Sequence, residues 1–480
     1  MPPSLALLLW LAFLVGLLCF DPARDSKASL ALWVPVIWIF ILGSRLPSQW
    51  LGGQVSQVAE ALEEGNPLDR IIFSALILLA IGVLMSRSFQ WGNFIARNLA
   101  LAALLSFALV SACWSDFPFV AFKRWIRDLG SYLVILVALS DPRPLEAVRT
   151  LLRRVCYLLV PLSILLIKYY PEISKQYDTW TGVAGFVGAA TSKNMLGVSC
   201  LISGLFFFWD TVSRWPDRKE RRTKRIILVN VAFFAMTLWL LNLSNSATSR
   251  VCLALGCLLI LAAHIRLVQR HPVFLKVLVP VFIVVYLILA LGFDLNGQLA
   301  GSVGRDPTLT DRTKIWTLLL SMQTNPLLGT GYESFWLGSR LERVWQTFNG
   351  LNEAHNGYLQ VYLNLGLIGL LLVVIFLVAS YRNVCRRLAP PPSLDSLALA
   401  IWAVLVFYNI TEAAFLAGLL WIVFLLGNVR LAASGKYRVH HVAASADAET
   451  TERLPTHLAP AGGQQAILAD VPGQYQKKGR

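Results

Sequence analysis

The side chains best suited to chemistry in this sequence are basic residues and one histidine in a polar segment between long apolar runs. Arg305 and Arg312 lie in the segment 294–355, and His355 ends it. An arginine fork binds two phosphate oxygens at once and keeps its charge at physiological pH. A histidine titrates near neutrality, so it can accept a proton from a hydroxyl group or hold that group in line. The pattern predicts a site for an anionic ligand next to a candidate base.

The position of these residues relative to a membrane follows from the charged segment 217–225 (DRKERRTKR). Clusters of lysine and arginine mark cytoplasmic loops, and counting apolar runs outward from this cluster places 294–355 on the external side. Further basic residues fall on that side, namely Lys123, Arg124, Arg127, Lys193, Arg250 and Lys314. Contact with lipid headgroups explains any one of them equally well. For the whole set, an external anion is the more economical explanation, and several cations around one cavity suit a diphosphate.

The elements that must position these residues are apolar helices. The chain has 480 residues, of which 56% are hydrophobic and 14% charged, with a mean hydropathy of +0.61. A soluble domain carries roughly a quarter charged residues, so the sequence predicts an all-α, polytopic membrane bundle of about 12–13 helices with a large external loop. The apolar runs lie at about 4–20, 29–43, 70–85, 95–113, 129–140, 152–167, 194–209, 226–243, 251–268, 273–293, 356–380, 395–412 and 414–433.

These runs define a domain plan. Residues 1–293 form the first part of the transmembrane bundle, 294–355 an external, periplasmic catalytic loop, and 356–433 the last transmembrane helices. Residues 434–480, rich in Ala, Gly, Pro and Gln, are expected to be a disordered cytoplasmic tail.

Several function classes are disfavoured. The seven cysteines show no metal-ligand spacing, and the sequence contains neither GxxxxGK[ST], GxGxxG nor DxD. We therefore expect no metal and no cofactor. The net charge of +15 could suggest nucleic acid, but most cations flank apolar runs and act as topology signals, so no nucleic-acid partner is expected.

Polar residues around His355 complete the candidate site. Asn356, Gln360 and Asn364 recur at intervals of four, so a helix places them on one polar stripe that should face the bundle interior. Their amides could bind sugar hydroxyls or bond to neighbouring helices. Glu353 and Glu412 are carboxylates near the external face, and either could orient His355 or replace it as the base.

Aromatic residues in the polar segment allow two explanations. Tyr332, in GTGYESFW, could stack on a sugar ring together with Trp316, Phe335 and Trp336. Aromatic residues also gather at membrane surfaces without binding anything, and we favour that explanation slightly.

Six motifs resemble the O-antigen ligase and polysaccharide polymerase family (Wzy-type), in particular its exopolysaccharide polymerase (ExoQ-like) branch. They occur in the expected order across most of residues 115–413. The loop motifs and HNGYLQ are specific together, whereas SNSATSR and NITEA would mean little alone. The matching pieces are WTGVAGFVGAATSKNMLG (180–197), SNSATSR (244–250), GRDPTLTDRTKIW (304–316), NPLLGTGYESFW (325–336), HNGYLQVYLNLGLIG (355–369) and NITEA (409–413).

The resemblance implies an inner-membrane glycosyltransferase that polymerises polyprenyl-diphosphate-linked oligosaccharide repeat units at the periplasmic face. It also implies a fold like that of C-type glycosyltransferases, and a chain-length regulator and a flippase as partners besides membrane lipids. A ligase that transfers glycan to lipid A core or protein remains open, as does a flippase of the same lipid-linked sugars. The expected site comprises catalytic His355, Arg312 and Glu412, diphosphate-binding Arg250, Arg124, Lys193 and Arg305, and sugar-binding Asn356, Gln360 and Tyr332.

Two departures from the family pattern concern this site. The family often has His-Lys-Asn where this chain has Ser192-Lys193-Asn194, which removes one proton acceptor. It often has Thr-Gly-Arg where this chain has Thr310-Asp311-Arg312, which puts a carboxylate beside the expected phosphate-binding arginine.

Overall fold

The computed structural model describes residues 1–20, 29–52, 65–177, 184–271, 273–292, 310–388 and 394–431. The chain divides into two units, Met1–Leu431 and Ala432–Arg480, and the second lies outside the described residues, as do the predicted tail and Arg305. The first unit is helical. In the described ranges its strands are β1 (Lys175–Tyr177) and β2 (Ala184–Phe186), which pair antiparallel.

Seven described helices are long and apolar enough to cross a membrane, and a bent pair, α6 (Trp91–Arg97) and α7 (Leu99–Val110), would make an eighth span. The protein is therefore an all-α, polytopic membrane protein, as the sequence predicts. The seven are α5 (Pro67–Ser86), α9 (Pro144–Tyr169), α11 (Lys193–Arg214), α12 (Arg221–Ser244), α13 (Ala247–His264), α19 (Gly357–Arg387) and α20 (Leu394–Thr411).

The prediction of about 12–13 spans also counted helices whose apolar part is shorter than 18 residues or that carry more than two charged residues in an 18-residue window. Three are short, namely α1 (Pro3–Phe20), α2 (Trp33–Gly43) and α21 (Gly418–Asn428). Helix α8 (Pro118–Leu139) carries four charged residues in FKRWIRD, near its start. Helix α15 (Val273–Gly292) is the remaining predicted run. Each of the thirteen apolar runs thus coincides with a helix. Not every one of these helices is long and apolar enough to count as a membrane span.

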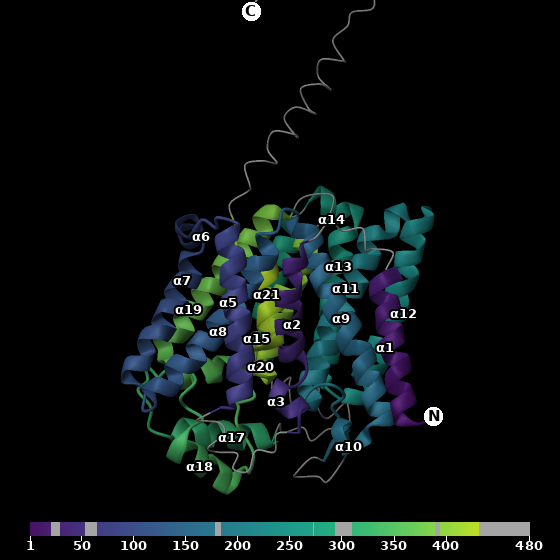
Figure 1. Cartoon of the computed structure of the whole chain (residues 1–480). Helices are drawn as coiled ribbons and strands as arrows, with labels where there is room; N and C mark the ends of the chain where they lie inside the picture. Colours follow the sequence, from purple (N-terminus) through teal and green to yellow (C-terminus); the bar gives the residue numbers. More distant parts are fainter. Residues whose placement is uncertain are drawn as a thin grey trace, which may run out of the picture. The chain divides into compact units, whose positions relative to one another are not determined.

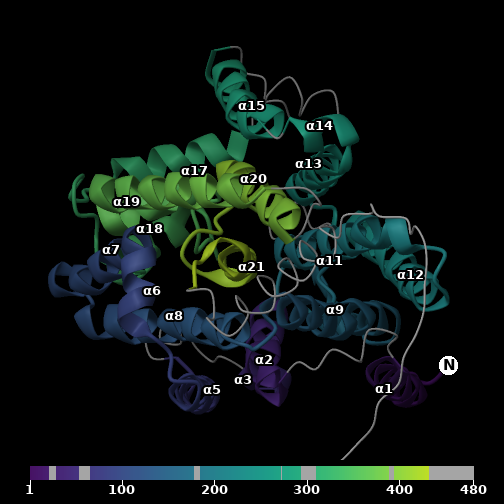
Figure 2. The ribbon, with the colours of Figure 1, turned by 90° about the horizontal axis from the view of Figure 1, so that it is seen from above.

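The helices differ in how much of their surface other helices cover. Of the apolar window of α9 and of α11, 78% is buried, compared with 28% for α5. Helix α11 packs against α9, α12 and α13, and Figure 2 shows it among these three helices. Apolar helices with exposed sides suit a lipid environment, whereas α9 and α11 form the interior.

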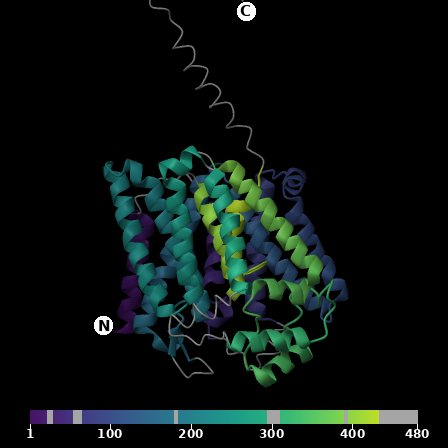
Figure 3. The same ribbon diagram turned by 180° about the vertical axis from the view of Figure 1, so that it is seen from behind.

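Short helices gather at one end of this bundle. The described part of the predicted external loop forms α17 (Thr310–Ser321) and α18 (Gly338–Thr347), which lie at the same end as α3 (Pro47–Trp50) and α10 (Pro171–Ser174) (Figure 1). Helix α14 (Arg266–Arg270) lies at the opposite end, and the view from behind shows the same arrangement (Figure 3). The segment 310–355 therefore covers the bundle end at which α11 and α19 begin.

Helix α19 is broken at Gly366, which has φ +64° and ψ −166°. The backbone of the NPLLGTG segment supplies the missing hydrogen bonds. Thr330 N and Gly331 N donate to the carbonyls of Leu363 and Asn364, while Leu367 N and Ile368 N donate to those of Pro326 and Leu327. A Cβ atom on residue 366 would lie 2.2 Å from Leu327 O. Only glycine permits both this left-handed conformation and this approach, so the break fixes the loop onto α19.

Candidate active site

Two helix starts place the first candidate side chains. The Ser192 side chain caps α11 by accepting a hydrogen bond from Met195 N, and the Asn356 side chain caps α19 by accepting from Tyr358 N and Leu359 N. Such caps satisfy backbone N–H groups that have no partner inside the helix. They fix Asn194 in the first turn of α11, and His355 just before the cap of α19.

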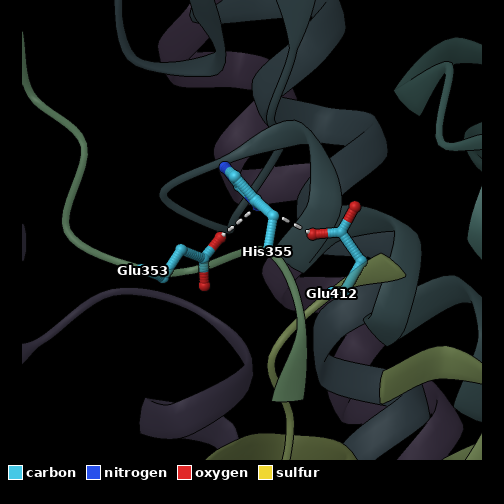
Figure 4. Close-up of side chains that lie close together, drawn as sticks. All are labelled: Glu353, His355 and Glu412. Carbon is cyan, nitrogen blue, oxygen red and sulfur yellow. Dashed lines mark hydrogen bonds and ion pairs between the residues drawn. The ribbon is translucent and has the colours of Figure 1, made fainter. Parts of the chain in front are cut away.

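His355 lies between two carboxylates (Figure 4). Its Nδ1 is 3.0 Å from Glu353 Oε1 and 3.2 Å from Glu412 Oε2. His355 has φ +47°, a left-handed conformation that is uncommon for a residue with a side chain. The preceding residue, Ala354, is fixed through both of its backbone polar groups. Trp316 Nε1 donates to Ala354 O, and Ala354 N donates to Gln360 Oε1. The His355 imidazole is therefore positioned by contacts with the carboxylates and with Ala354, and not by the hydrogen bonds of α19.

Glu412 joins four segments of the chain. It follows α20 directly and is 4% exposed. Arg312 Nη2 donates to its Oε1 at 2.9 Å, and Asn194 Nδ2 donates to its Oε2 at 2.9 Å, the same oxygen that faces His355. The motifs TSKN, TDRTK, HNGYLQ and NITEA thus meet at one buried carboxylate. A buried carboxylate needs such cationic and hydrogen-bonding partners.

Close packing of α19 against α20 makes this meeting possible. A Cβ atom on Gly357 would lie 1.8 Å from Asn409 Oδ1, so only glycine fits at the start of α19. Asn409 is fully buried, and its Oδ1 accepts from Ala414 N at 2.8 Å. The turn that carries Glu412 is therefore fixed against the helix that follows His355.

The two carboxylates decide the protonation state of His355. Burial favours the neutral imidazole, but the hydrogen bonds and negative charges of Glu353 and Glu412 outweigh burial and raise the pKa of His355 to about 10. The imidazole is then a cation at neutral pH. The sequence predicts a base at this position, whereas the raised pKa favours the protonated imidazole.

Glu353, His355 and Glu412 could also be considered as metal ligands, because their ligand atoms all lie within 4.8 Å of one another. Carboxylate oxygen and imidazole nitrogen are common ligands of divalent cations. In this arrangement, however, Arg312 already binds Glu412 Oε1, and His355 bonds to both carboxylates through the nitrogen that faces them. An ion would have to displace these contacts.

Comparison with known proteins identifies the central part of the chain. A family model described as O-antigen ligase matches residues 231–374. Residues 231–374 are therefore similar to the O-antigen ligase family. The exopolysaccharide production protein ExoQ of Rhizobium meliloti (strain 1021) is 29% identical over 311 residues, which cover 62% of this chain and 67% of ExoQ. The resemblance to this family and to its ExoQ-like branch is therefore confirmed.

The range that matches the O-antigen ligase model holds only part of the site. Arg312, Glu353 and His355 lie within the matched range, whereas Asn194 and Glu412 lie outside it. The fold brings these last two residues to the domain from α11 and from the end of α20. Asn194 was not among the expected site residues, and its only sequence signal is its place in TSKN, next to Lys193.

The other predicted diphosphate ligands within the described ranges are Lys193, Arg250 and Arg124. Lys193 is the neighbour of Asn194 at the start of α11. Arg250 is exposed and donates from Nη2 to Asn245 Oδ1 at 2.7 Å, although Thr248, two residues earlier, shares a hydrogen bond with Thr411 at 2.8 Å. The described hydrogen bond of Arg250 is thus to Asn245, while its neighbour Thr248 contacts the end of α20, next to Glu412.

Arg124 belongs to a second group, on α8. Its Nη1 donates to the carbonyl oxygen of Glu333. Glu333 has φ +52°, and burial together with the neighbouring Asp128 raises the pKa of its carboxyl group. Tyr332, predicted to contact sugar, is 4% exposed and donates its hydroxyl to Asp128 Oδ2 at 3.0 Å. The Tyr332 ring therefore packs inside the turn and presents no open face to a sugar.

The polar stripe of α19 faces the loop. Gln360 Oε1 accepts from Trp336 Nε1 at 3.0 Å, and Asn364 Oδ1 accepts from Phe335 N at 3.1 Å. The Asn356 side-chain oxygen is the helix cap described above. Gln360 and Asn364 thus form hydrogen bonds with the loop. These residues position His355 and the loop.

Proposed function

We propose that the protein is an inner-membrane glycosyltransferase that joins polyprenyl-diphosphate-linked oligosaccharide repeat units at the periplasmic face. The observation that carries the proposal is the meeting of Arg312, His355 and Glu412 at the bundle end covered by α17 and α18. The similarity to ExoQ supports a polymerase of exopolysaccharide. The cationic segment 217–225, which runs into the start of α12, supports the external orientation.

Arg312 would bind the donor diphosphate. In the reaction the bond between the anomeric carbon and the diphosphate oxygen breaks, and the oxygen of the acceptor hydroxyl forms the new bond. Negative charge develops on the departing diphosphate, where a guanidinium fork stabilises it. Arg312 is 23% exposed, so its outer side can meet a ligand while Nη2 contacts Glu412. Diphosphate would draw Arg312 away from Glu412 Oε1.

The proton of the acceptor hydroxyl needs a destination. His355 holds its proton at neutral pH, since its pKa is about 10, and cannot take another. Glu412 Oε1, released by Arg312, is a carboxylate oxygen that can accept it, while Oε2 stays bound to Asn194 and His355. The His355 cation then offsets the negative charge at the site. Glu412 thus acts as the base, and His355 and Asn194 orient it.

A test in cells separates the candidate functions. Arg312→Ala, His355→Ala and Glu412→Gln should insert normally, abolish long polymer and leave single lipid-linked repeats on the outer leaflet. Arg343→Ala, an exposed cation on α18, is the matched control and should make normal polymer. Loss of the lipid-linked repeats from the outer leaflet would indicate a flippase instead. Normal polymer that is no longer transferred to lipid A core or protein would indicate a ligase.

A further inference from the structure

A buried ionic cluster lies near the far end of α11, away from His355. Asp210 is fully buried. Arg153 Nη2 lies 2.5 Å from its Oδ2, Arg214 Nε lies 3.0 Å from both of its oxygens, and Asn230 Nδ2 donates to Oδ2 at 2.8 Å. These residues come from α9, α11 and α12. The cluster is distinct from the site at Glu412.

The cluster holds more positive than negative charge. Arg149 is a third arginine, with Nε 3.8 Å from Asp210 Oδ1 and with its guanidinium 4.8 Å from the Trp209 ring. Arg149 Nε is buried and has no hydrogen-bond partner among the described residues. Three guanidinium groups thus surround one carboxylate, which leaves an excess of two charges. The nearby Arg143 and Glu146 pair with one another at 3.4 Å and cancel.

The cluster lies across the membrane from the His355 site. Asn194 and Asp210 are both on α11, and Asp210 follows Asn194 by sixteen positions (210 − 194). At 1.5 Å per residue this is about 24 Å, close to the thickness of the hydrocarbon core. An anion bound at Arg149 is therefore not the donor diphosphate bound at Arg312.

We propose that Arg149 and Arg214 bind the phosphate headgroup of an anionic membrane lipid, with Arg153 and Asp210 as the buried base of the site. Excess charge at membrane depth needs a counter-ion, and basic pockets between transmembrane helices bind anionic headgroups. The side chains of Arg149 and Arg214 are 34% and 24% exposed, whereas that of Arg153 is 4% exposed. The two outer arginines can therefore reach a ligand.

The surface beside the two outer arginines favours a lipid over a soluble phosphate. Leu145, on α9, and Trp215, after α11, are each 53% exposed. Leucine suits contact with acyl chains, and tryptophan gathers at the boundary between the hydrocarbon core and the headgroups. A lipid would satisfy both the arginines and these apolar side chains, whereas a free phosphate would satisfy the arginines alone.

The experiment measures lipid binding with the intact protein. Purified wild type in detergent is titrated with dioleoyl-phosphatidylglycerol, and the bound lipid is counted by native mass spectrometry. Arg149→Gln and Arg214→Gln should each weaken binding about fivefold, which corresponds to about 1 kcal/mol for one basic residue near an anionic lipid. Arg218→Gln is the control, because Arg218 lies at the same end and contacts Trp215 and not Asp210.

A second readout separates binding from a purely structural role. The unfolding temperature of the wild type should be higher in phosphatidylglycerol nanodiscs than in phosphatidylcholine nanodiscs, and Arg149→Gln should remove this difference. Equal destabilisation of Arg149→Gln in both lipids, with unchanged phosphatidylglycerol binding, would overturn the proposal. If inorganic phosphate stabilised the wild type as much as phosphatidylglycerol does, the ligand would be a free phosphate and not a lipid.

Discussion

Arg312 Nη2 donates to Glu412 Oε1 at 2.9 Å, although 100 residues separate the two along the chain. One of them is the cation expected to bind the donor diphosphate, and the other is the carboxylate expected to take the acceptor proton. Each neutralises the other until a diphosphate arrives. Donor binding would therefore both position the leaving group and release the base, so the reaction starts only with the donor in place.

Removal of the Arg312 guanidinium should slow glycosyl transfer about a hundredfold to a thousandfold, because one preorganised contact to the developing charge is lost. Arg312→Lys should recover only part of the rate, since an ammonium cannot bind two oxygens in the same fork. Single-turnover transfer rates measure this. A lysine variant with the full wild-type rate would show that charge alone suffices.

The pH dependence should follow His355. With a pKa of about 10, the imidazolium persists through neutral pH, so activity that depends on it should fall only near pH 10. Glu353→Gln removes one negative neighbour, lowers the pKa of His355, and should move the alkaline limit to lower pH. Initial rates from pH 6 to 10.5 test this, and an unmoved alkaline limit in Glu353→Gln would contradict it.

The same shift links folding to pH. The pKa of His355 is raised on folding from 6.5 to about 10, so the folded state binds the proton more tightly. The resulting stabilisation is complete below pH 6.5 and is lost as the pH rises toward 10. The unfolding temperature of the wild type should therefore fall more over this range than that of His355→Gln. If the unfolding temperatures of the two proteins fell equally with pH, this would contradict the raised pKa of His355.

Sequence reasoning identified the helices, and it placed Arg312, His355 and Glu412 in one candidate site. Apolar runs mark helices because lipid and the bundle interior both exclude polar groups. Arg312 was chosen because external cations oppose the positive-inside tendency, and His355 because a histidine titrates near neutrality. The partnership of Asn194 with Glu412 joins residues 218 positions apart and depends on how the helices pack. No local pattern contains that information.

Three other features were hidden for related reasons. Gly366 sits in an uninterrupted apolar run, and hydropathy does not report a backbone angle of +64°. Tyr332 was one of four aromatic residues considered for sugar stacking, and no local pattern predicts that its hydroxyl bonds to Asp128 inside the fold. The charge of His355 depends on two carboxylates at about hydrogen-bond distance, one of them 57 residues away.

Gly366→Ala should destabilise the protein by about 3 kcal/mol, because it adds strain at a positive φ and a clash with Leu327 O. Gly82→Ala in α5 is the control. A Cβ atom there meets nothing within 4 Å, and alanine suits a helix better than glycine does. Thermal unfolding in detergent measures both. Equal unfolding temperatures for the two variants would show that the break in α19 is not maintained.

Chelation of divalent cations should leave activity unchanged. Arg312 and the His355 cation already supply positive charge beside Glu412, and a metal ion would have to displace both from the carboxylate. Transfer rates before and after EDTA, with Mg²⁺ or Mn²⁺ added back, provide the measurement. Activity that disappears with EDTA and returns with a metal ion would assign Glu353, His355 and Glu412 to ion binding.

The decisive measurement uses purified protein in vesicles with a defined polyprenyl-diphosphate oligosaccharide as both donor and acceptor, and follows product length by gel electrophoresis. Wild type and Arg343→Ala should join the units into longer lipid-linked chains without any nucleotide, while Arg312→Ala and Glu412→Gln leave them single. Equal elongation by Arg312→Ala and wild type would contradict the role of this arginine and carboxylate in glycosyl transfer.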